Sequence, residues 1–391
     1  MIKRELYLER IRPFIGKDVV KVITGLRRSG KSVFLEMLMD EIDNPTHSLY
    51  INFESKKNEK YANADALYSY VMEKTGGGKG EWHLFFDEIQ EVEDWEKVIN
   101  SFRVDFDADI YITGSNSRLL SGELATLISG RYVRFVIYPL SYREFLLLNK
   151  GKTFAYYLKF GGMPFISNVI DDENAVSLYL DDVYNSVILK DVVKRYKIRD
   201  VDLLDRICSY LLANIGQTFS ATSIAKHFKN ERRRVSADTV LNYIKACEEA
   251  HLFYKLKRQD IKGKKILEVA EKYFVADHGL REAVYGYDNK DIGMVLENII
   301  CLEMLRRGYD VTVGRVGNEE IDFVGVRNNE PIYVQVAYLM PDPKTQEREF
   351  GNLLKIGDNY PKYVVTMDEI DMSQKGIRHV NISDFLLNDW A

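Results

Sequence analysis

The sequence predicts an α/β protein that begins with a parallel β-sheet covered by helices on both faces. Between residues 18 and 116, short apolar runs alternate with amphipathic stretches; the runs are residues 19–24, 49–53, 84–86 and 110–113, and the stretches are 33–42, 64–74 and 95–104. Strands that alternate with helices are typical of parallel sheets. A glycine-containing loop follows the first run and two acids follow the third, at the strand ends where such a sheet binds ligands.

Length and composition indicate a globular protein of several domains. The chain has 391 residues, too many for one ordinary core, and its 46% hydrophobic and 29% charged residues exclude a disordered or fibrous chain. The net charge of −5 argues against a protein that binds nucleic acid over its whole surface. The three cysteines form no CxxC pair, the charged N-terminus does not resemble a signal peptide, and no apolar run would span a bilayer. We expect a soluble, cytoplasmic protein without a membrane partner.

The loop after the first apolar run matches the phosphate-binding pattern G-x-x-x-x-G-K-[ST] in full. Its residues are Gly25, Leu26, Arg27, Arg28, Ser29, Gly30, Lys31 and Ser32. Glycine permits the backbone angles that turn N–H groups inward, and the helix that follows adds the partial positive charge of its N-terminus. We therefore expect this loop to bind ATP, with Lys31 reaching the terminal phosphates and the Ser32 hydroxyl binding Mg²⁺.

Two acids, Asp87 and Glu88, directly follow the apolar run at residues 84–86. At the carboxyl end of a buried strand, Asp87 would hold Mg²⁺ and Glu88 would orient and polarise the attacking water. The alternative is a strand end followed by solvated acids, which the phosphate-binding loop makes the weaker interpretation. Asn116 follows the next strand and is predicted to hydrogen-bond the γ-phosphate or the water; the alternative is an ordinary turn residue.

This arrangement resembles the AAA+ superfamily. More narrowly, the segments GLRRSGKS, LFFDEIQ, TGSNSRLLS, SGRYVRF, YPLSYREF and FGGMPF resemble a group of bacterial and archaeal predicted ATPases in which an AAA+ core precedes a C-terminal region. The resemblance implies that Asn116 is a sensor residue. It also implies that Arg131 is an arginine finger, which in a homo-oligomer would act on the neighbouring subunit. The alternative for Arg131 is a surface or salt-bridging arginine.

The chain is predicted to divide into four parts. Residues 1–140 form the P-loop AAA+ ATPase core, and residues 141–200 form a mostly helical lid. Residues 201–284 have the order helix, turn, helix and hairpin, which is typical of a winged helix-turn-helix. Residues 285–391 form a final α/β domain.

Charge in the third part favours double-stranded DNA as a partner. Residues 226–272 contain 13 Lys or Arg and 7 Asp or Glu, a net of +6 in a chain whose total is −5. The candidate DNA contacts are Arg232, Arg233, Arg234, Lys255, Lys257, Arg258, Lys262, Lys264 and Lys265. The alternative is a protein-packing module whose lysines form a solvated face.

The final part resembles the restriction-endonuclease-like fold at Glu297, Asp322 and Gln335. Nucleases of that fold hold Mg²⁺ with an acid and an E-x-K triplet on adjacent strands. Here Gln335 replaces the triplet's acid and Ala337 its lysine, so we expect a degenerate domain without nuclease activity. The open alternatives are a packing domain, nucleic-acid binding without cleavage, and residual metal-dependent cleavage.

These features together predict a Mg²⁺-dependent ATPase that hydrolyses ATP and couples its nucleotide state to DNA binding. The alternative function is a nucleotide-switched scaffold or regulator of protein partners that has no role on DNA.

Overall fold

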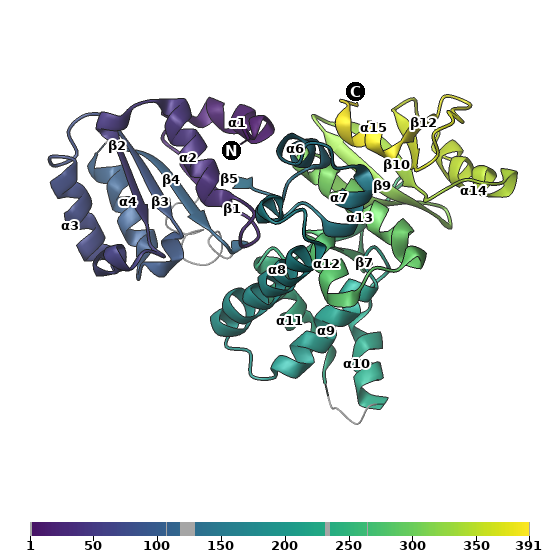
Figure 1. Ribbon diagram of the computed structural model, residues 1–391, viewed down its shortest axis with the longest axis horizontal. Helices are drawn as coiled ribbons and strands as arrows, with labels where there is room; N and C mark the ends of the chain where they lie inside the picture. Colours follow the sequence, from purple (N-terminus) through teal and green to yellow (C-terminus); the bar gives the residue numbers. More distant parts are fainter. Residues whose placement is uncertain (1, 107, 118–129, 231–234, 264, 391) are drawn as a thin grey trace. The chain divides into compact units, whose positions relative to one another are not determined.

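The computed structural model describes residues 2–106, 108–117, 130–230, 235–263 and 265–390 (Figure 1). The chain forms two compact units. The first comprises residues 1–138 with 249–251, and the second comprises residues 139–248 with 252–391. Among the described residues, none of the helices is both long and apolar enough to cross a membrane.

The first unit is built on a five-stranded parallel sheet with the strand order β2-β3-β4-β1-β5. The strands are β1 (Val20–Thr24), β2 (Ser48–Asn52), β3 (Trp82–Asp87), β4 (Ala108–Gly114) and β5 (Tyr132–Val136). This confirms the parallel sheet and its first four strands. The apolar runs do not predict β5, since only one of its five residues is buried.

Helices cover both faces of this sheet. They are α1 (Glu5–Ile11), α2 (Lys31–Ile42), α3 (Ala64–Lys74) and α4 (Trp95–Asp105), with α1 and α2 on one face and α3 and α4 on the other (Figure 1). The apolar stripes of α3 and α4 pack against alternate residues of β1, β3 and β4, which together form one buried cluster. Helices α2, α3 and α4 each connect two parallel strands, so the carboxyl ends of the strands share one edge.

A buried ionic network lies at the opposite edge of the sheet, centred on Asp109 at the start of β4. Asp109 forms an ion pair with Lys21 of β1, lies 3.0 Å from His83 Nδ1 of β3 and accepts a hydrogen bond of 2.8 Å from Tyr111. Burial alone raises the pKa of Asp109, but the contacts with His83 and Lys21 outweigh it and lower that pKa. The carboxylate thus joins three strands.

The second unit contains most of the helices. They are α6 (Tyr142–Leu148), α7 (Phe154–Phe160), α8 (Glu173–Ser186), α9 (Val201–Ala213), α10 (Ala221–Asn230), α11 (Ala237–Glu249), α12 (His278–Tyr285), α13 (Ile292–Arg306), α14 (Pro343–Leu354) and α15 (Ile382–Leu387). Helix α11 ends at the segment that groups with the first unit. A π-helical stretch, Val187–Lys194, continues α8.

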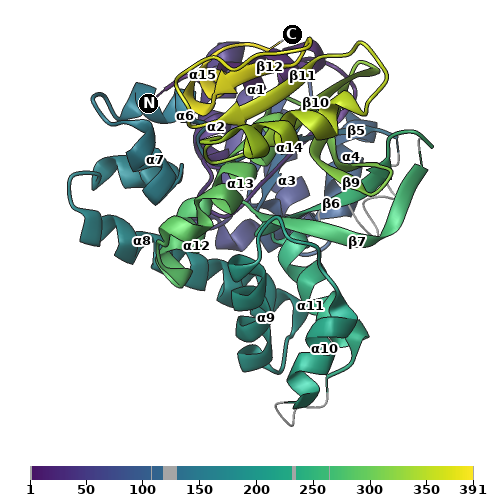
Figure 2. The same ribbon diagram turned by 90° about the vertical axis from the view of Figure 1, so that its right-hand side faces the viewer.

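The second unit also contains a seven-stranded mixed sheet with the order β12-β11-β10-β9-β8-β6-β7 (Figure 2). Its strands are β6 (Phe253–Asp260), β7 (Lys265–Val275), β8 (Asp310–Val316), β9 (Glu319–Arg327), β10 (Glu330–Val336), β11 (Lys362–Thr366) and β12 (Arg378–Asn381). The hairpin predicted as the wing of a separate domain is β6–β7. Because β6 pairs in parallel with β8, this hairpin continues the C-terminal sheet, and the predicted boundary between residues 284 and 285 divides one sheet.

The two glycines of the FGGMPF segment, Gly161 and Gly162, lie at a close contact between chain segments of the second unit. Gly162 donates its N–H to Asp277 at 2.8 Å and accepts one from Leu140 at 2.7 Å. A Cβ on Gly162 would lie 2.2 Å from the Leu140 carbonyl oxygen, and one on Gly161 would lie 2.1 Å from the Asp277 carboxylate. Only glycine fits at both positions, so this pair packs the helical lid against the N-terminus of α12.

Candidate nucleotide site

The phosphate-binding loop connects β1 to α2 and has an unusual backbone. Gly25, Arg28 and Gly30 have φ angles of +152°, +65° and +99°. A Cβ on Gly25 would lie 2.2 Å from the carbonyl oxygen of Ile137, so only glycine permits this approach. The N–H of Ser29 donates to the Leu26 carbonyl at 3.1 Å, which closes the turn before the helix begins.

Lys31 is the first residue of α2 and is 4% exposed. Its Nζ donates to the carbonyls of Gly25 and Leu26, each at 3.2 Å, and lies 3.7 Å from Glu88 Oε1. The ammonium group therefore lies over the loop. Ser32, the predicted Mg²⁺ ligand, is the next residue of the helix and is half-buried.

Two buried hydroxyl groups beside the loop fit a ligand that accepts hydrogen bonds. Thr24 Oγ1 and Ser29 Oγ are buried and have no hydrogen-bond partner among the described residues. A buried polar atom without a partner is unfavourable, and a bound anion with its metal would supply partners. Together with Lys31 and the N-terminus of α2, these hydroxyls suit the phosphates of a nucleotide.

Asp87 is the last residue of β3, is fully buried and is held by donors from two neighbouring strands. Its Oδ2 accepts hydrogen bonds from Tyr50 at 3.0 Å and from Asn52 at 2.9 Å, while Thr113 donates to its Oδ1. Burial, together with Asp87, raises the pKa of Tyr50 to about 12, so the phenol stays protonated and donates. Neutral donors therefore stabilise a carboxylate at the position predicted to hold Mg²⁺.

Glu88 follows Asp87 and turns the chain away from the strand. Its φ is +55°, in the left-handed region that a residue with a side chain rarely adopts, and its N–H donates to Thr113 Oγ1 at 2.9 Å. The Gln90 amide donates to its Oε2. Glu88 is only 7% exposed, so its carboxylate is fixed beside Lys31. A strained backbone of this kind is typical of functional sites.

Asn116 and Arg131 lie at opposite edges of the sheet. Asn116 is 1% exposed and follows β4, which lies between β1 and β3, so it shares the edge that carries the loop and the two acids. Arg131 is exposed and directly precedes β5, where Tyr132 pairs with Val20 at the start of β1. The sequence-predicted residues therefore converge, except for Arg131.

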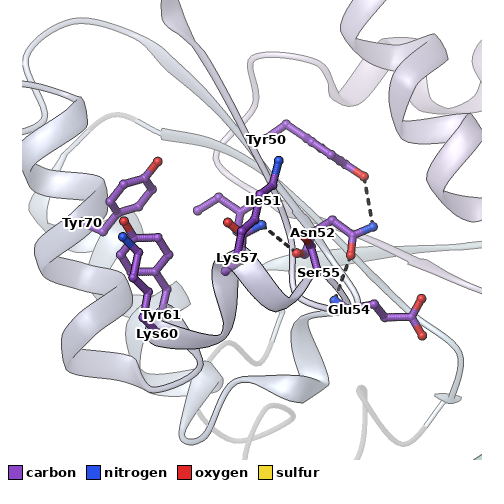
Figure 3. Close-up of a pocket in the computed structure, with 10 residues that line it drawn as sticks. Tyr50, Ile51, Asn52, Glu54, Ser55, Lys57, Lys60, Tyr61 and Tyr70 are labelled. Carbon is purple, nitrogen blue, oxygen red and sulfur yellow. Dashed lines mark hydrogen bonds between the residues drawn. The ribbon is translucent and has the colours of Figure 1, made fainter.

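A cavity of about 660 Å³ opens beside Asn52 (Figure 3). Tyr50 and Asn52 lie at its rim, and the segment Lys56–Tyr61 forms one wall. Glu54 forms an ion pair of 3.1 Å with Arg27 of the phosphate-binding loop. The stretch after β2 thus contacts both the loop and the buried acid. None of these contacts follows from a sequence pattern, because each joins segments that are distant along the chain.

The basic residues predicted to contact DNA are only partly accessible. Lys255 lies 3.5 Å from Glu271 and 3.9 Å from Glu248, and Arg258 lies 3.3 Å from Glu320. Lys257 and Lys262 are exposed. Outside the described residues lie Arg232, Arg233, Arg234, Lys264 and the side chain of Lys265.

The three residues of the nuclease-like site lie close together in the second unit. Asp322 of β9 donates its N–H to the Gln335 side chain at 3.4 Å and accepts the Val336 N–H at 2.8 Å. Burial and the neighbouring Asp322 raise the pKa of Glu297, in α13, well above its usual range. Burial also raises the pKa of Asp322 to about 7. In the described chain, no three or more His, Cys, Asp or Glu side chains are arranged to hold a metal ion.

No sequence pattern predicts Lys272 as part of this cluster. Its Nζ lies 2.6 Å from Glu320 and 4.0 Å from Glu297, so β7 supplies a cation to this group of acids. Burial lowers the pKa of Lys272, but the carboxylates of Glu297 and Glu320 outweigh it and raise that pKa. The lysine is brought here because the hairpin belongs to the same sheet.

Comparison with known proteins defines the class of the first unit. Residues 17–146 match the family model of an AAA domain, and residues 151–291 match that of a domain of unknown function. A Walker-type ATPase of Pyrococcus abyssi has the same fold, with a TM-score of 0.50 and 13% identity over 73% of this chain and 95% of that one. The first unit is therefore a nucleotide-binding P-loop ATPase domain.

Two relatives extend along almost the whole chain. An uncharacterized protein of Haemophilus influenzae is 39% identical over 99% of both chains. An uncharacterized protein of Methanocaldococcus jannaschii is 30% identical over 93% of this chain and 85% of its own. The chain belongs to the family that these bacterial and archaeal proteins form.

The raised pKa of Asp322 predicts a pH-dependent stability. The folded pKa of about 7 lies above the ordinary value of 3.8, so the folded state holds this proton more tightly and its stabilising effect is lost as the pH rises through 7. Asp322→Asn should therefore become more stable relative to the wild type between pH 5 and pH 8, by about 2–4 kcal/mol. Urea denaturation at the two pH values measures this, and a pH-independent difference would contradict it.

Proposed function

We propose that this protein is a Mg²⁺-dependent ATPase that couples its nucleotide state to DNA binding. The convergence of Lys31, Asp87 and Glu88 at one edge of the parallel sheet carries the first half of the proposal. Phosphoryl transfer to water requires three groups that are found here. They are an ammonium group over a loop of N–H donors, a carboxylate held by neutral donors, and a second carboxylate 3.7 Å from the ammonium.

Each group has one task in this proposal. The loop and Lys31 bind the phosphates, and Ser32 and Asp87 hold Mg²⁺, which would neutralise charge on the phosphate oxygens when bound. Glu88 accepts a proton from the attacking water, and the buried Asn116 orients that water or the γ-phosphate. The ammonium group of Lys31 contacts the Glu88 carboxylate in this structure. When Lys31 binds the phosphates instead, its positive charge moves away from Glu88, the proposed base.

Substitution of the two charged residues separates binding from hydrolysis. Lys31→Ala removes the phosphate-binding ammonium group and should weaken ATP binding about 100-fold or more. Glu88→Gln is isosteric and should keep ATP binding within a few-fold of the wild type, while lowering kcat about 10²–10⁴-fold. Isothermal titration and phosphate release measure the two effects. Wild-type turnover by Glu88→Gln would show that another group is the base.

Arg131 acts on a neighbouring subunit in this proposal. It is exposed and lies one strand length, about 16 Å, from the loop end of its own sheet. A finger at that position reaches a γ-phosphate only in a homo-oligomer.

A mixing experiment tests this role of Arg131. Arg131→Ala and Lys31→Ala should each be inactive alone, and an equimolar mixture should recover activity, because mixed assemblies contain intact loops facing intact arginines. Phosphate release over a range of mixing ratios measures the recovery. Full activity of Arg131→Ala by itself would exclude the role.

The charge of residues 226–272 supports DNA as the partner that nucleotide controls. Of the described cations, Lys255, Lys257 and Lys262 are exposed and Arg258 is half-buried, and both Lys255 and Arg258 lie near carboxylates. The continuity of β6–β7 with the C-terminal sheet favours the second candidate, a nucleotide-switched scaffold for protein partners, because a hairpin within a sheet is less free to lie along a DNA groove.

A salt titration distinguishes these two functions. If DNA binds, replacement of both Lys257 and Lys262 by alanine should weaken duplex binding and reduce the salt slope by about one to two. Lys255→Ala is the matched control and should have a smaller effect, since its charge is already paired. Fluorescence anisotropy at 50–200 mM salt, with and without ATP, measures this. No binding at low salt in either state would leave the scaffold function.

A further inference from the structure

We propose that Arg4 orients the phosphate-binding loop and joins it to the end of the first unit at Tyr138. This inference rests on the proposed ATP site and adds a positioning residue to it. Arg4 directly precedes α1 and is only 3% exposed. No motif includes it, and it lies 21 residues before the loop begins.

The guanidinium of Arg4 donates to two carbonyl oxygens from different segments. Nη1 donates to Ser29 of the loop at 3.2 Å, and Nη2 donates to Tyr138 at 2.9 Å. Its central carbon lies 4.5 Å from the centre of the Tyr7 ring, and the Tyr7 hydroxyl accepts the Tyr138 N–H at 3.3 Å. A buried arginine is costly unless its donors are used, so these contacts indicate a fixed side chain.

The contact with Ser29 determines how one peptide of the loop is oriented. In a planar trans peptide the C=O and the following N–H point in opposite directions. Because Arg4 holds the Ser29 carbonyl, the Gly30 N–H points away from Arg4. Gly30 has a φ of +99° and no side chain to resist rotation of this peptide. Arg4 therefore keeps a carbonyl oxygen from turning towards the phosphates, where it would repel them.

The contact with Tyr138 joins the loop to the chain at the unit boundary. The N–H of Ile137 donates to Thr24 at 2.8 Å, and its carbonyl lies where a side chain on Gly25 would be. Ile137 therefore contacts the beginning of the loop directly, and Tyr138 is connected to the later part of the loop through Arg4. The chain leaves the first unit immediately after Tyr138. A shift of the loop on phosphate binding would be transmitted to this exit point.

Lysine cannot replace arginine in this arrangement. Two acceptors that lie in different directions, and the face of an aromatic ring, match the planar fork of a guanidinium, whereas an ammonium is a single point charge. Arg4→Lys should consequently keep the charge and one hydrogen bond, and lose the simultaneous contact with Ser29 and Tyr138.

Nucleotide affinity and chemical rescue test the positioning role. Arg4→Ala should weaken ATP binding about 10-fold or more, and guanidinium chloride at non-denaturing, millimolar concentration should restore part of the loss while NaCl does not. Arg4→Lys should be intermediate at an unchanged melting temperature. Arg12→Ala is the matched control, since Arg12 forms ion pairs with Glu5 at 2.6 Å and Glu41 at 2.7 Å, and neither of these acids belongs to the loop. It should change the affinity less than two-fold.

Hydrogen–deuterium exchange tests the link to Tyr138. In the wild type, saturating ATP should slow exchange in peptides that contain residues 137–140, and in Arg4→Ala it should not, even when ATP is raised to saturate the variant. Binding of ATP by the wild type tests the proposed function. The ratio of the ATP affinity of the Arg4 variants to that of the wild type tests the inference. Equal affinities for Arg4→Ala, Arg4→Lys and the wild type would overturn it, as would a loss in Arg4→Ala that guanidinium does not rescue while Arg4→Lys binds normally.

Discussion

The Asp87 carboxylate is the point on which the geometry of the nucleotide site depends. It ends β3 and is held by side chains of β2 and β4, so three strands are joined at their carboxyl ends. Thr113 has two functions here, because its hydroxyl donates to Asp87 and accepts the Glu88 N–H. The acid proposed to hold Mg²⁺ and the proposed base are therefore both positioned by one hydroxyl group. Any movement of β4 changes both.

The phosphate-binding loop, the two acids and Asn116 could be predicted from the sequence, because each lies directly after an apolar run. The side chains that hold these residues in place could not be predicted from the sequence. Tyr50, Thr113 and Arg4 reach the site across strands or from a separate helix, and a pattern along the chain carries no information on such contacts. The same limit explains Lys272, which enters the nuclease-like cluster because β6 pairs with β8, more than 50 residues further along.

Two buried acids in this protein are stabilised by different means. Asp87 is surrounded by neutral donors, which can yield to a cation without leaving another charge unpaired. Asp322 lies among other acids, and burial raises its pKa to about 7. Lys272 compensates part of this acidic cluster and at the same time fixes β7 to the sheet. The first environment suits exchange of ligands, and the second suits permanent packing.

The ionic network around Asp109 has a consequence for how the strands align. Successive residues of a strand point to opposite faces, so a slip of β1 by one position would turn Lys21 away from Asp109 and break the buried ion pair between them. Alternative alignments of the sheet are therefore strongly disfavoured during folding. The phosphate-binding loop begins four residues after Lys21. The ion pair between Lys21 and Asp109, at the opposite edge of the sheet, thus fixes the register of β1 and with it the position of the loop. Its role is to set this position and not to take part in the chemistry.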